Sequence, residues 1–132
     1  MRRVFVDTSA VYALLVASDN NHAPAAEAFR RLILDQSQLV ASSDVLVESS
    51  ALLGLRVGLP AVATFRTELA PVLEVIWIDA ELHERGLDLL LARGNRALSL
   101  VDAVSFLVMR QQRIEDVFAY DQHFADEGFV VL

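Results

Sequence analysis

The sequence has no cysteine, no lysine and no long uninterrupted apolar run. Without cysteine the chain forms no disulfide, no thiolate zinc site and no cysteine nucleophile, a composition that fits a reducing compartment. Its apolar runs all fall short of the roughly 20 residues that a membrane-spanning helix needs. The opening residues MRRVFVDTSA place an acid and two hydroxyls where a secretion signal needs an apolar core, so we expect a cytoplasmic protein.

The charge balance is acidic. Eighteen Asp and Glu residues oppose eleven basic residues, all of them arginine, which gives a formal net charge of −7. Broad electrostatic capture of nucleic acid needs a basic surface, so this balance argues against it. A nucleic-acid enzyme is still compatible with it, because bound cations would cancel part of the negative charge and a few arginines can contact phosphates. A basic partner protein is the other interpretation.

Apolar periodicity and turn residues alternate along the chain in the manner of strands followed by helices. They predict strands at residues 3–7, 39–42, 73–78, 117–120 and 129–132, and helices at 9–16, 24–34, 44–56, 61–69, 80–92 and 99–113. With 132 residues and no linker, we expect one domain over 1–132. The predicted fold is α/β, a three-layer sandwich with a central, mainly parallel sheet of four to five strands flanked by helices.

Four carboxylates stand in strongly apolar segments, namely Asp7 in VFVDTSA, Glu48 in DVLVESSALL, Asp102 in LSLVDAVSF and Asp121 in VFAYDQHF. An ionised carboxylate in apolar surroundings loses hydration and needs a partner. The chain has no lysine, and none of the four segments contains arginine. A divalent cation is therefore the natural partner.

The predicted topology brings these acids to one place. The carboxyl ends of parallel strands share one edge of a sheet, and Asp7 and Asp121 each follow a strand. Glu48 lies in the first turns of the helix that leaves the second strand at the same edge. The helix at 99–113 is about 21 Å long, so its start, which carries Asp102, reaches back to that edge.

Such a cluster suits Mg²⁺ or Mn²⁺, which prefer carboxylate oxygen and water to imidazole or thiolate. These cations also bind phosphate oxygens, lower the pKa of a bound water and stabilise the charge of a leaving oxygen. Without a cation the crowded carboxylates would repel one another, which raises the pKa of at least one. The residues thus point to metal-dependent hydrolysis of a phosphodiester.

Several motifs occur in a fixed order. The first strand ends in D-T-S at residues 7–9, a loop carries D-x-x-H at Asp19 and His22, and a helix carries Glu48. L-S-L-V-D then opens the penultimate helix, and A-Y-D-Q-H-F precedes G-F-V-V-L. Together these motifs resemble the PIN-domain nuclease family, in particular the small VapC-type ribonuclease toxins, over nearly the whole chain. Ser99 stands where the motif more often has Thr, which preserves the hydroxyl.

The resemblance implies an endoribonuclease that uses Mg²⁺ or Mn²⁺ and leaves 5′-phosphate and 3′-hydroxyl ends. It also implies the toxin half of a type II toxin–antitoxin system, with an RNA substrate, a cognate antitoxin protein and a homodimeric state. By the same resemblance the catalytic and metal-binding acids would be Asp7, Glu48, Asp102 and Asp121, with Thr8 and Ser9 as supporting hydroxyls.

Each acid also has a structural interpretation. Asp7 and Asp121 follow strands, where aspartate commonly caps a helix or forms a turn. Glu48 can face solvent. Asp102 lies three residues after Ser99, the spacing of a capping box, although the usual partner there is Glu or Gln. The joint pattern favours a functional site, because four coincidences at one sheet edge are less expected than any one of them.

Other polar residues have weaker functional interpretations. Asp19 and His22 precede a helix and fit capping better than an outer contact to metal or substrate. His123 is interpreted as structural. Arg93 and Arg96 flank the loop before the helix of Asp102 and are candidate RNA contacts, with a solvated loop as the competing interpretation.

Two other functional classes compete. Response-regulator receivers and haloacid-dehalogenase-like phosphatases also gather acids at strand ends, but they use an essential lysine, and D-T-S lacks the second Asp of a phosphatase D-x-D. The absence of G-x-x-x-x-G-K-[ST] excludes a P-loop enzyme. A PIN fold that serves as a non-catalytic protein-interaction module, or as a solitary housekeeping nuclease, is the remaining alternative.

Overall fold

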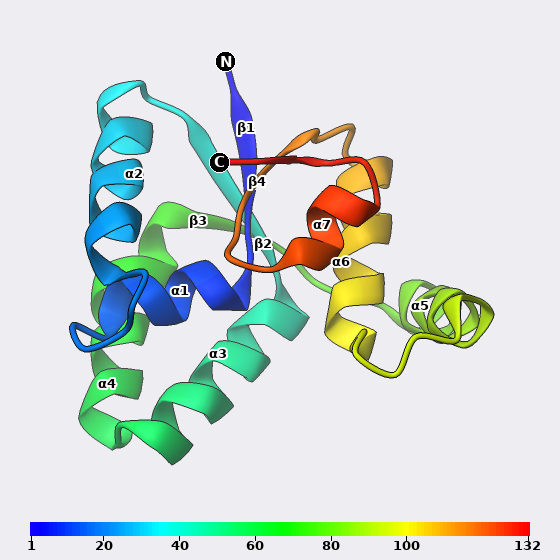
Figure 1. Ribbon diagram of the computed structural model, residues 1–132, viewed down its shortest axis with the longest axis horizontal. Helices are drawn as coiled ribbons and strands as arrows, with labels where there is room; N and C mark the ends of the chain where they lie inside the picture. Colours follow the sequence, from blue (N-terminus) through cyan, green and yellow to red (C-terminus); the bar gives the residue numbers. More distant parts are fainter.

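The computed structural model describes all 132 residues and contains a five-stranded sheet (Figure 1). Every neighbouring pair of strands is parallel, and the order is β3-β2-β1-β4-β5. The strands are β1 (Arg3–Val6), β2 (Gln38–Ser42), β3 (Leu73–Ile76), β4 (Asp116–Phe118) and β5 (Val130–Val131). The predicted α/β fold with a parallel sheet is confirmed.

Helices cover both faces of this sheet. Figure 1 shows α1, α2 and α4 on one side and α5, α6 and α7 on the other, which makes three layers. The helices are α1 (Thr8–Leu15), α2 (His22–Leu34), α3 (Ser43–Arg56), α4 (Leu59–Thr64), α5 (Ala80–Arg93), α6 (Leu100–Gln111) and α7 (Gln122–Asp126). A π-helical turn at Phe65–Leu69 and a 3-10 turn at Ala70–Val72 join α4 to β3. None of the helices has the length and apolarity needed to cross a bilayer.

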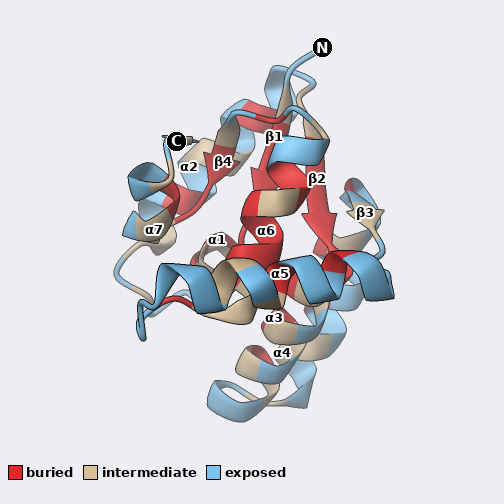
Figure 2. Ribbon diagram, turned by 90° about the vertical axis from the view of Figure 1, so that its right-hand side faces the viewer, coloured by how far each residue is buried: buried red, intermediate tan, exposed pale blue.

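The core lies around β1 and α6. Val4 and Phe5 of β1 have no exposed surface, and Figure 2 shows α6 largely buried behind α5. Parallel strands with helices on both faces bury side chains in both directions, which is why β1 and β4 are apolar without alternation. Because α6 lies between the sheet and α5, an acid at its first turn is carried by a largely buried helix.

The short helix α7 (Gln122–Asp126) was not predicted from the sequence. It follows β4, and the two last strands are shorter than the predicted 117–120 and 129–132. Five residues are too few to show a helical period. The helix forms because Asp121 caps its first turn and Phe124 is buried against Phe106, with their ring centroids 5.2 Å apart in a T-shaped contact.

Gly86 allows α5 to pack closely on α6, because a β-carbon at this position would lie 2.5 Å from Val104 Cγ2. Val104 is fully buried and β-branched, so it cannot move aside cheaply. We expect Gly86→Ala to lower the free energy of unfolding by about 1–3 kcal/mol in urea melts followed by circular dichroism.

The matched control is Gly54→Ala on α3, where the new β-carbon would only touch Val62 at 3.4 Å. Its higher helix propensity should raise stability by up to about 1 kcal/mol. Equal effects of the two substitutions would contradict the proposed close packing of α5 on α6.

Candidate metal centre

The first half of the chain adds strands on one side of β1 (β2, then β3), and the second half adds them on the other side (β4, then β5). The strand order therefore switches direction at β1. In open parallel sheets such a switch point leaves a crevice beyond the carboxyl ends of the strands. A cavity of about 290 Å³ lies among the residues that follow these strand ends. Its lining residues are Asp7, Thr8, Ser9, Glu48, Leu52, Ser99, Asp102 and Asp121. The four acids and two hydroxyls selected from the sequence therefore share one cavity.

Asp7 is the most enclosed of the acids, with 3% of its surface exposed. It caps α1 through Oδ2, which accepts hydrogen bonds from the Ser9 backbone N–H at 3.1 Å and from Ser9 Oγ at 2.6 Å. Its Oδ1 atom is buried and has no hydrogen-bond partner. Burial raises the pKa of Asp7 to about 6, although the two hydrogen bonds from Ser9 oppose the rise.

The two hydroxyls next to Asp7 connect the site to its neighbours. Ser9 Oγ accepts a hydrogen bond from the Tyr120 backbone N–H at 2.9 Å, so the start of α1 is tied to the end of β4. Thr8 is buried, and its Oγ1 accepts a hydrogen bond from Ser49 Oγ of α3 at 3.4 Å. These contacts hold the segments that carry Asp7, Glu48 and Asp121 together.

Glu48 enters the cavity from α3. This helix starts immediately after β2, where Ser42 Oγ accepts a hydrogen bond from the Val45 backbone N–H at 3.1 Å. Partial burial raises the pKa of the Glu48 carboxyl, the Thr8 hydroxyl opposes this rise, and the charges of Asp102 and Asp121 add to it. The alternative interpretation, in which Glu48 simply faces solvent, does not fit this partly buried position.

Asp102 combines a structural contact with a place in the cavity. Its Oδ2 accepts a hydrogen bond from the Ser99 backbone N–H at 3.0 Å, and Ser99 Oγ accepts one from the Asp102 backbone N–H at 3.0 Å. The capping box is therefore present, with Asp in place of the usual Glu or Gln. Burial raises the pKa of Asp102, and the nearby charge of Asp121 raises it further.

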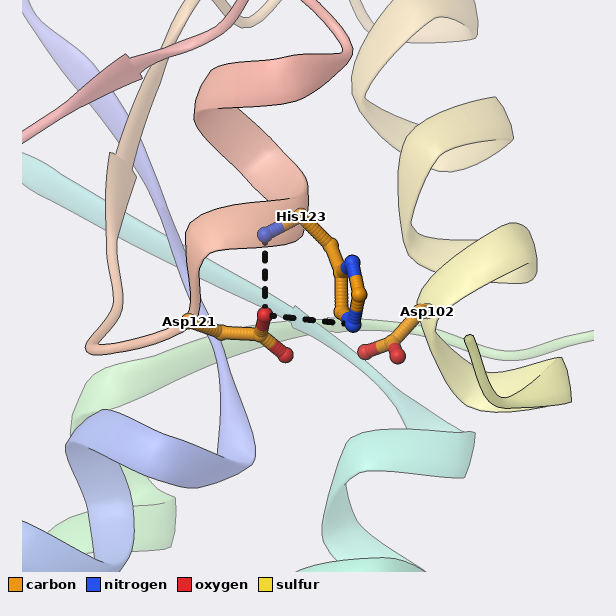
Figure 3. Close-up of side chains that lie close together, drawn as sticks. All are labelled: Asp102, Asp121 and His123. Atoms are coloured by element: carbon orange, nitrogen blue, oxygen red, sulfur yellow. Dashed lines mark hydrogen bonds and ion pairs between the residues drawn. The ribbon is translucent and has the colours of Figure 1, made fainter. Parts of the chain in front are cut away.

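Asp121 lies opposite Asp102, and His123 lies with them (Figure 3). Asp121 Oδ1 accepts a hydrogen bond from the His123 backbone N–H at 2.9 Å, and the imidazole Nε2 is 3.8 Å from the same oxygen. One possible ligand atom from each of these three residues lies within 4.8 Å of the others. From the sequence His123 was interpreted as structural. Its position two residues after Asp121, on the short α7, was the signal that could have placed it here.

Two further residues from the motifs lie in local contacts outside the cavity. Asp19 Oδ2 accepts a hydrogen bond from the Asn21 backbone N–H at 3.0 Å. The His22 Nδ1 atom is 2.9 Å from the Ala13 carbonyl oxygen, which ties α2 to α1. These contacts agree with the structural interpretation of both residues.

The arginines selected from the sequence also lie outside this cavity. Arg93 forms an ion pair with Glu127, with Nη2 and Oε1 2.9 Å apart. Arg96 is exposed and forms no ion pair. No basic side chain lines the cavity of the four acids. Contact with RNA stays a prediction for both arginines.

The cavity residues fit a hard divalent cation. The buried Asp7 Oδ1 atom has no partner, although buried polar atoms in proteins are almost always paired. Three carboxyls of the cavity have raised pKa values, and carboxylate oxygen is the donor that Mg²⁺ and Mn²⁺ prefer. A cation would supply the opposite charge that neither lysine nor arginine supplies there.

Comparison with known proteins identifies the family. The model of the PIN domain family matches residues 4–129. The chain belongs to the PIN-domain family. VapC20 of Mycobacterium tuberculosis, a 23S rRNA-specific endonuclease, is 38% identical to it over 129 residues, which cover 96% of this chain and 95% of VapC20. The family predicted from the motifs is therefore confirmed.

Solved structures agree with this assignment. The crystal structure of Mycobacterium tuberculosis VapC20, a sarcin–ricin loop cleaving toxin, superposes on this PIN domain with a TM-score of 0.82 at 36% identity and covers 96% of each chain. A toxin–antitoxin complex from Klebsiella pneumoniae shares the fold with a TM-score of 0.65 at 18% identity, over 98% of this chain and 95% of that one.

The buried Asp7 makes the stability of this PIN domain depend on pH when no metal is bound. A carboxyl whose pKa is about 6 in the folded protein and 3.8 without its surroundings stabilises the fold while it is protonated. This contribution is complete below pH 3.8 and is lost as the pH rises through about 6. We expect wild type, relative to Asp7→Asn, to lose about 3 kcal/mol between about pH 3 and about pH 8 in chelator.

The measurement is urea unfolding of both proteins in chelator at the two pH values. Asn retains an oxygen that can cap α1, so the comparison isolates the charge of Asp7. An unchanged stability difference between the two proteins across this range would refute the assignment of a raised pKa to Asp7.

Proposed function

We propose that the chain, as one domain over residues 1–132, is a metal-dependent endoribonuclease of the VapC toxin type. The observation that carries this function is that four carboxylates line one cavity, and that one of them, Asp7, has a buried oxygen without a partner. The 38% identity to a VapC endonuclease over 96% of the chain supports the reaction class. A ribonuclease of this type agrees with the function expected from the motifs.

Asp7, Glu48, Asp102 and Asp121 are the proposed ligands of Mg²⁺ or Mn²⁺. When bound, such a cation supplies Lewis acidity that lowers the pKa of water and offsets charge on a phosphodiester. Three of these acids keep their positions by capping helices with one oxygen, namely Asp7, Asp102 and Asp121. The second oxygen of each stays available to the cavity, since it accepts no hydrogen bond.

The chain also provides features that favour an anionic substrate. Thr8 and Ser9 start α1, and Ser99 precedes the first turn of α6, so two helix N-termini border the cavity. The partial positive charge of helix N-termini attracts phosphate. Arg96 is the better of the two proposed phosphate contacts, because it is exposed and unpaired, whereas the charge of Arg93 is balanced by Glu127.

The proposed substrate is the sarcin–ricin loop of 23S ribosomal RNA, since VapC20 cleaves that loop and shares more than a third of its residues with this chain. We place this activity in the cytoplasm, where the ribosome is found. A toxin of this type requires an antitoxin protein that restrains it, and we propose such a partner here.

A homodimer is the proposed solution state. Leu55 at the end of α3 is 86% exposed and Leu59 at the start of α4 is 77% exposed. Val47 on α3 is also exposed. Large apolar side chains grouped on neighbouring helices favour burial against another protein surface.

The activity test compares wild type with Asp7→Asn and Asp102→Asn on RNA that contains the sarcin–ricin loop. With Mg²⁺ or Mn²⁺ we expect wild type to cleave, and each variant to lose about 100-fold or more of the rate, because a ligand charge is gone while the cap remains. Chelator should abolish cleavage. Cleavage is read on a denaturing gel, with an unstructured RNA as the comparison substrate.

Asp79→Asn is the matched control. Asp79 caps α5 by accepting a hydrogen bond from the Leu82 backbone N–H at 2.9 Å, and it does not line the acidic cavity. Its substitution should leave the rate within about threefold, since Asn caps a helix about as well as Asp and the residue is outside the cavity. Equal cleavage by wild type and both site variants, or cleavage unaffected by chelator, would leave a non-catalytic interaction module as the better description.

A further inference from the structure

The chain has three histidines, and they differ sharply in surroundings. His22 is satisfied by the Ala13 carbonyl oxygen, 2.9 Å from its Nδ1 atom. His83 is exposed on α5. The imidazole of His123 forms no hydrogen bond, yet its Nε2 atom faces the carboxylates of Asp102 and Asp121 (Figure 3). Of the three, only His123 has an unused nitrogen beside two carboxylates of the acidic cavity, at the edge of that cavity rather than among its lining residues.

Packing holds the backbone of His123 in place. Phe124, the neighbour of His123 on α7, is fully buried and meets Phe106 of α6 with ring centroids 5.2 Å apart. Phe106 lies one helical turn after Asp102 on α6. The contact between the two rings therefore positions α7 against α6 near Asp102, and the cap formed by Asp121 holds the first turn of α7.

The imidazole and Asp121 are within ion-pair distance but do not form a hydrogen bond. The imidazole Nε2 atom is 3.8 Å from Asp121 Oδ1, which is beyond hydrogen-bond distance. That oxygen already accepts the His123 backbone N–H at 2.9 Å. A separation of 3.8 Å is also compatible with two ligand atoms of one cation, since each would lie about 2.1 Å from a small divalent ion.

Asp7, whose buried Oδ1 atom has no partner, lines the same cavity as Asp102 and Asp121 and independently indicates a cation there. We propose that His123 is a nitrogen ligand of this cation, and that it makes the centre bind Mn²⁺ in preference to Mg²⁺. The inference rests on the proposed function, which requires the cation. Mg²⁺ takes oxygen ligands and keeps its waters, whereas divalent transition metals also accept imidazole nitrogen.

The test measures metal binding rather than cleavage. Calorimetric titration of the full chain with Mn²⁺ and with Mg²⁺, at one pH near neutrality, gives the ratio of the two dissociation constants. We expect His123→Gln to weaken Mn²⁺ binding at least about tenfold and to change Mg²⁺ binding by less than about threefold. Pulsed electron paramagnetic resonance of the Mn²⁺-loaded chain should show coupling to an imidazole nitrogen that is lost in His123→Gln.

His83→Gln is the matched control and should keep both the nitrogen coupling and the preference for Mn²⁺. Thermal unfolding checks that the variants are folded, and the spectrum of wild type tests the ligand even if His123→Gln does not fold. Wild type that binds Mn²⁺ without nitrogen coupling would overturn the inference and leave the proposed function intact. Wild type that binds neither cation would overturn both.

Discussion

The burial of one carboxylate at the end of the central strand is the constraint on which the rest of the site depends. Asp7 follows β1 directly and lies between α1 and the end of β4, with only one of its oxygens paired. A buried carboxyl in this state either takes up a proton or requires a cation. Ser9 holds one oxygen and, through the Tyr120 backbone N–H, ties it to the strand that delivers Asp121.

Helix capping and cation binding are compatible in this molecule because a carboxylate has two oxygens. Asp7, Asp102 and Asp121 each use one oxygen as a helix cap and leave the other free of hydrogen bonds. The caps keep the carboxylates in place without consuming their capacity to bind a metal. The structural interpretation of Asp102 as part of a capping box is thus correct, and it explains how that side chain is held in the cavity.

Much of the fold was predictable because its signals are local. Apolar strands of a doubly covered sheet, helix caps such as Ser99 and Asp79, and the break at Gly94 all appear in neighbouring residues. The short α7 was missed because its stability comes from the contact of Phe124 with Phe106, which lies eighteen residues earlier in the chain. For the same reason, the sequence placed Asp121 at the sheet edge but did not place His123 beside Asp102.

The sequence by itself determined the fold class, the family and the four acids that meet, since alternation of strands and helices in a parallel sheet leaves those acids on one edge. Only the tertiary structure decided which side-chain atoms are buried and which have a hydrogen-bond or ion-pair partner. It showed that Asp7 Oδ1 has no partner, that Glu48 is partly buried, and that Arg93 is paired with Glu127. Burial and pairing depend on segments that are distant in the chain, and no local pattern of residues encodes the distances between them.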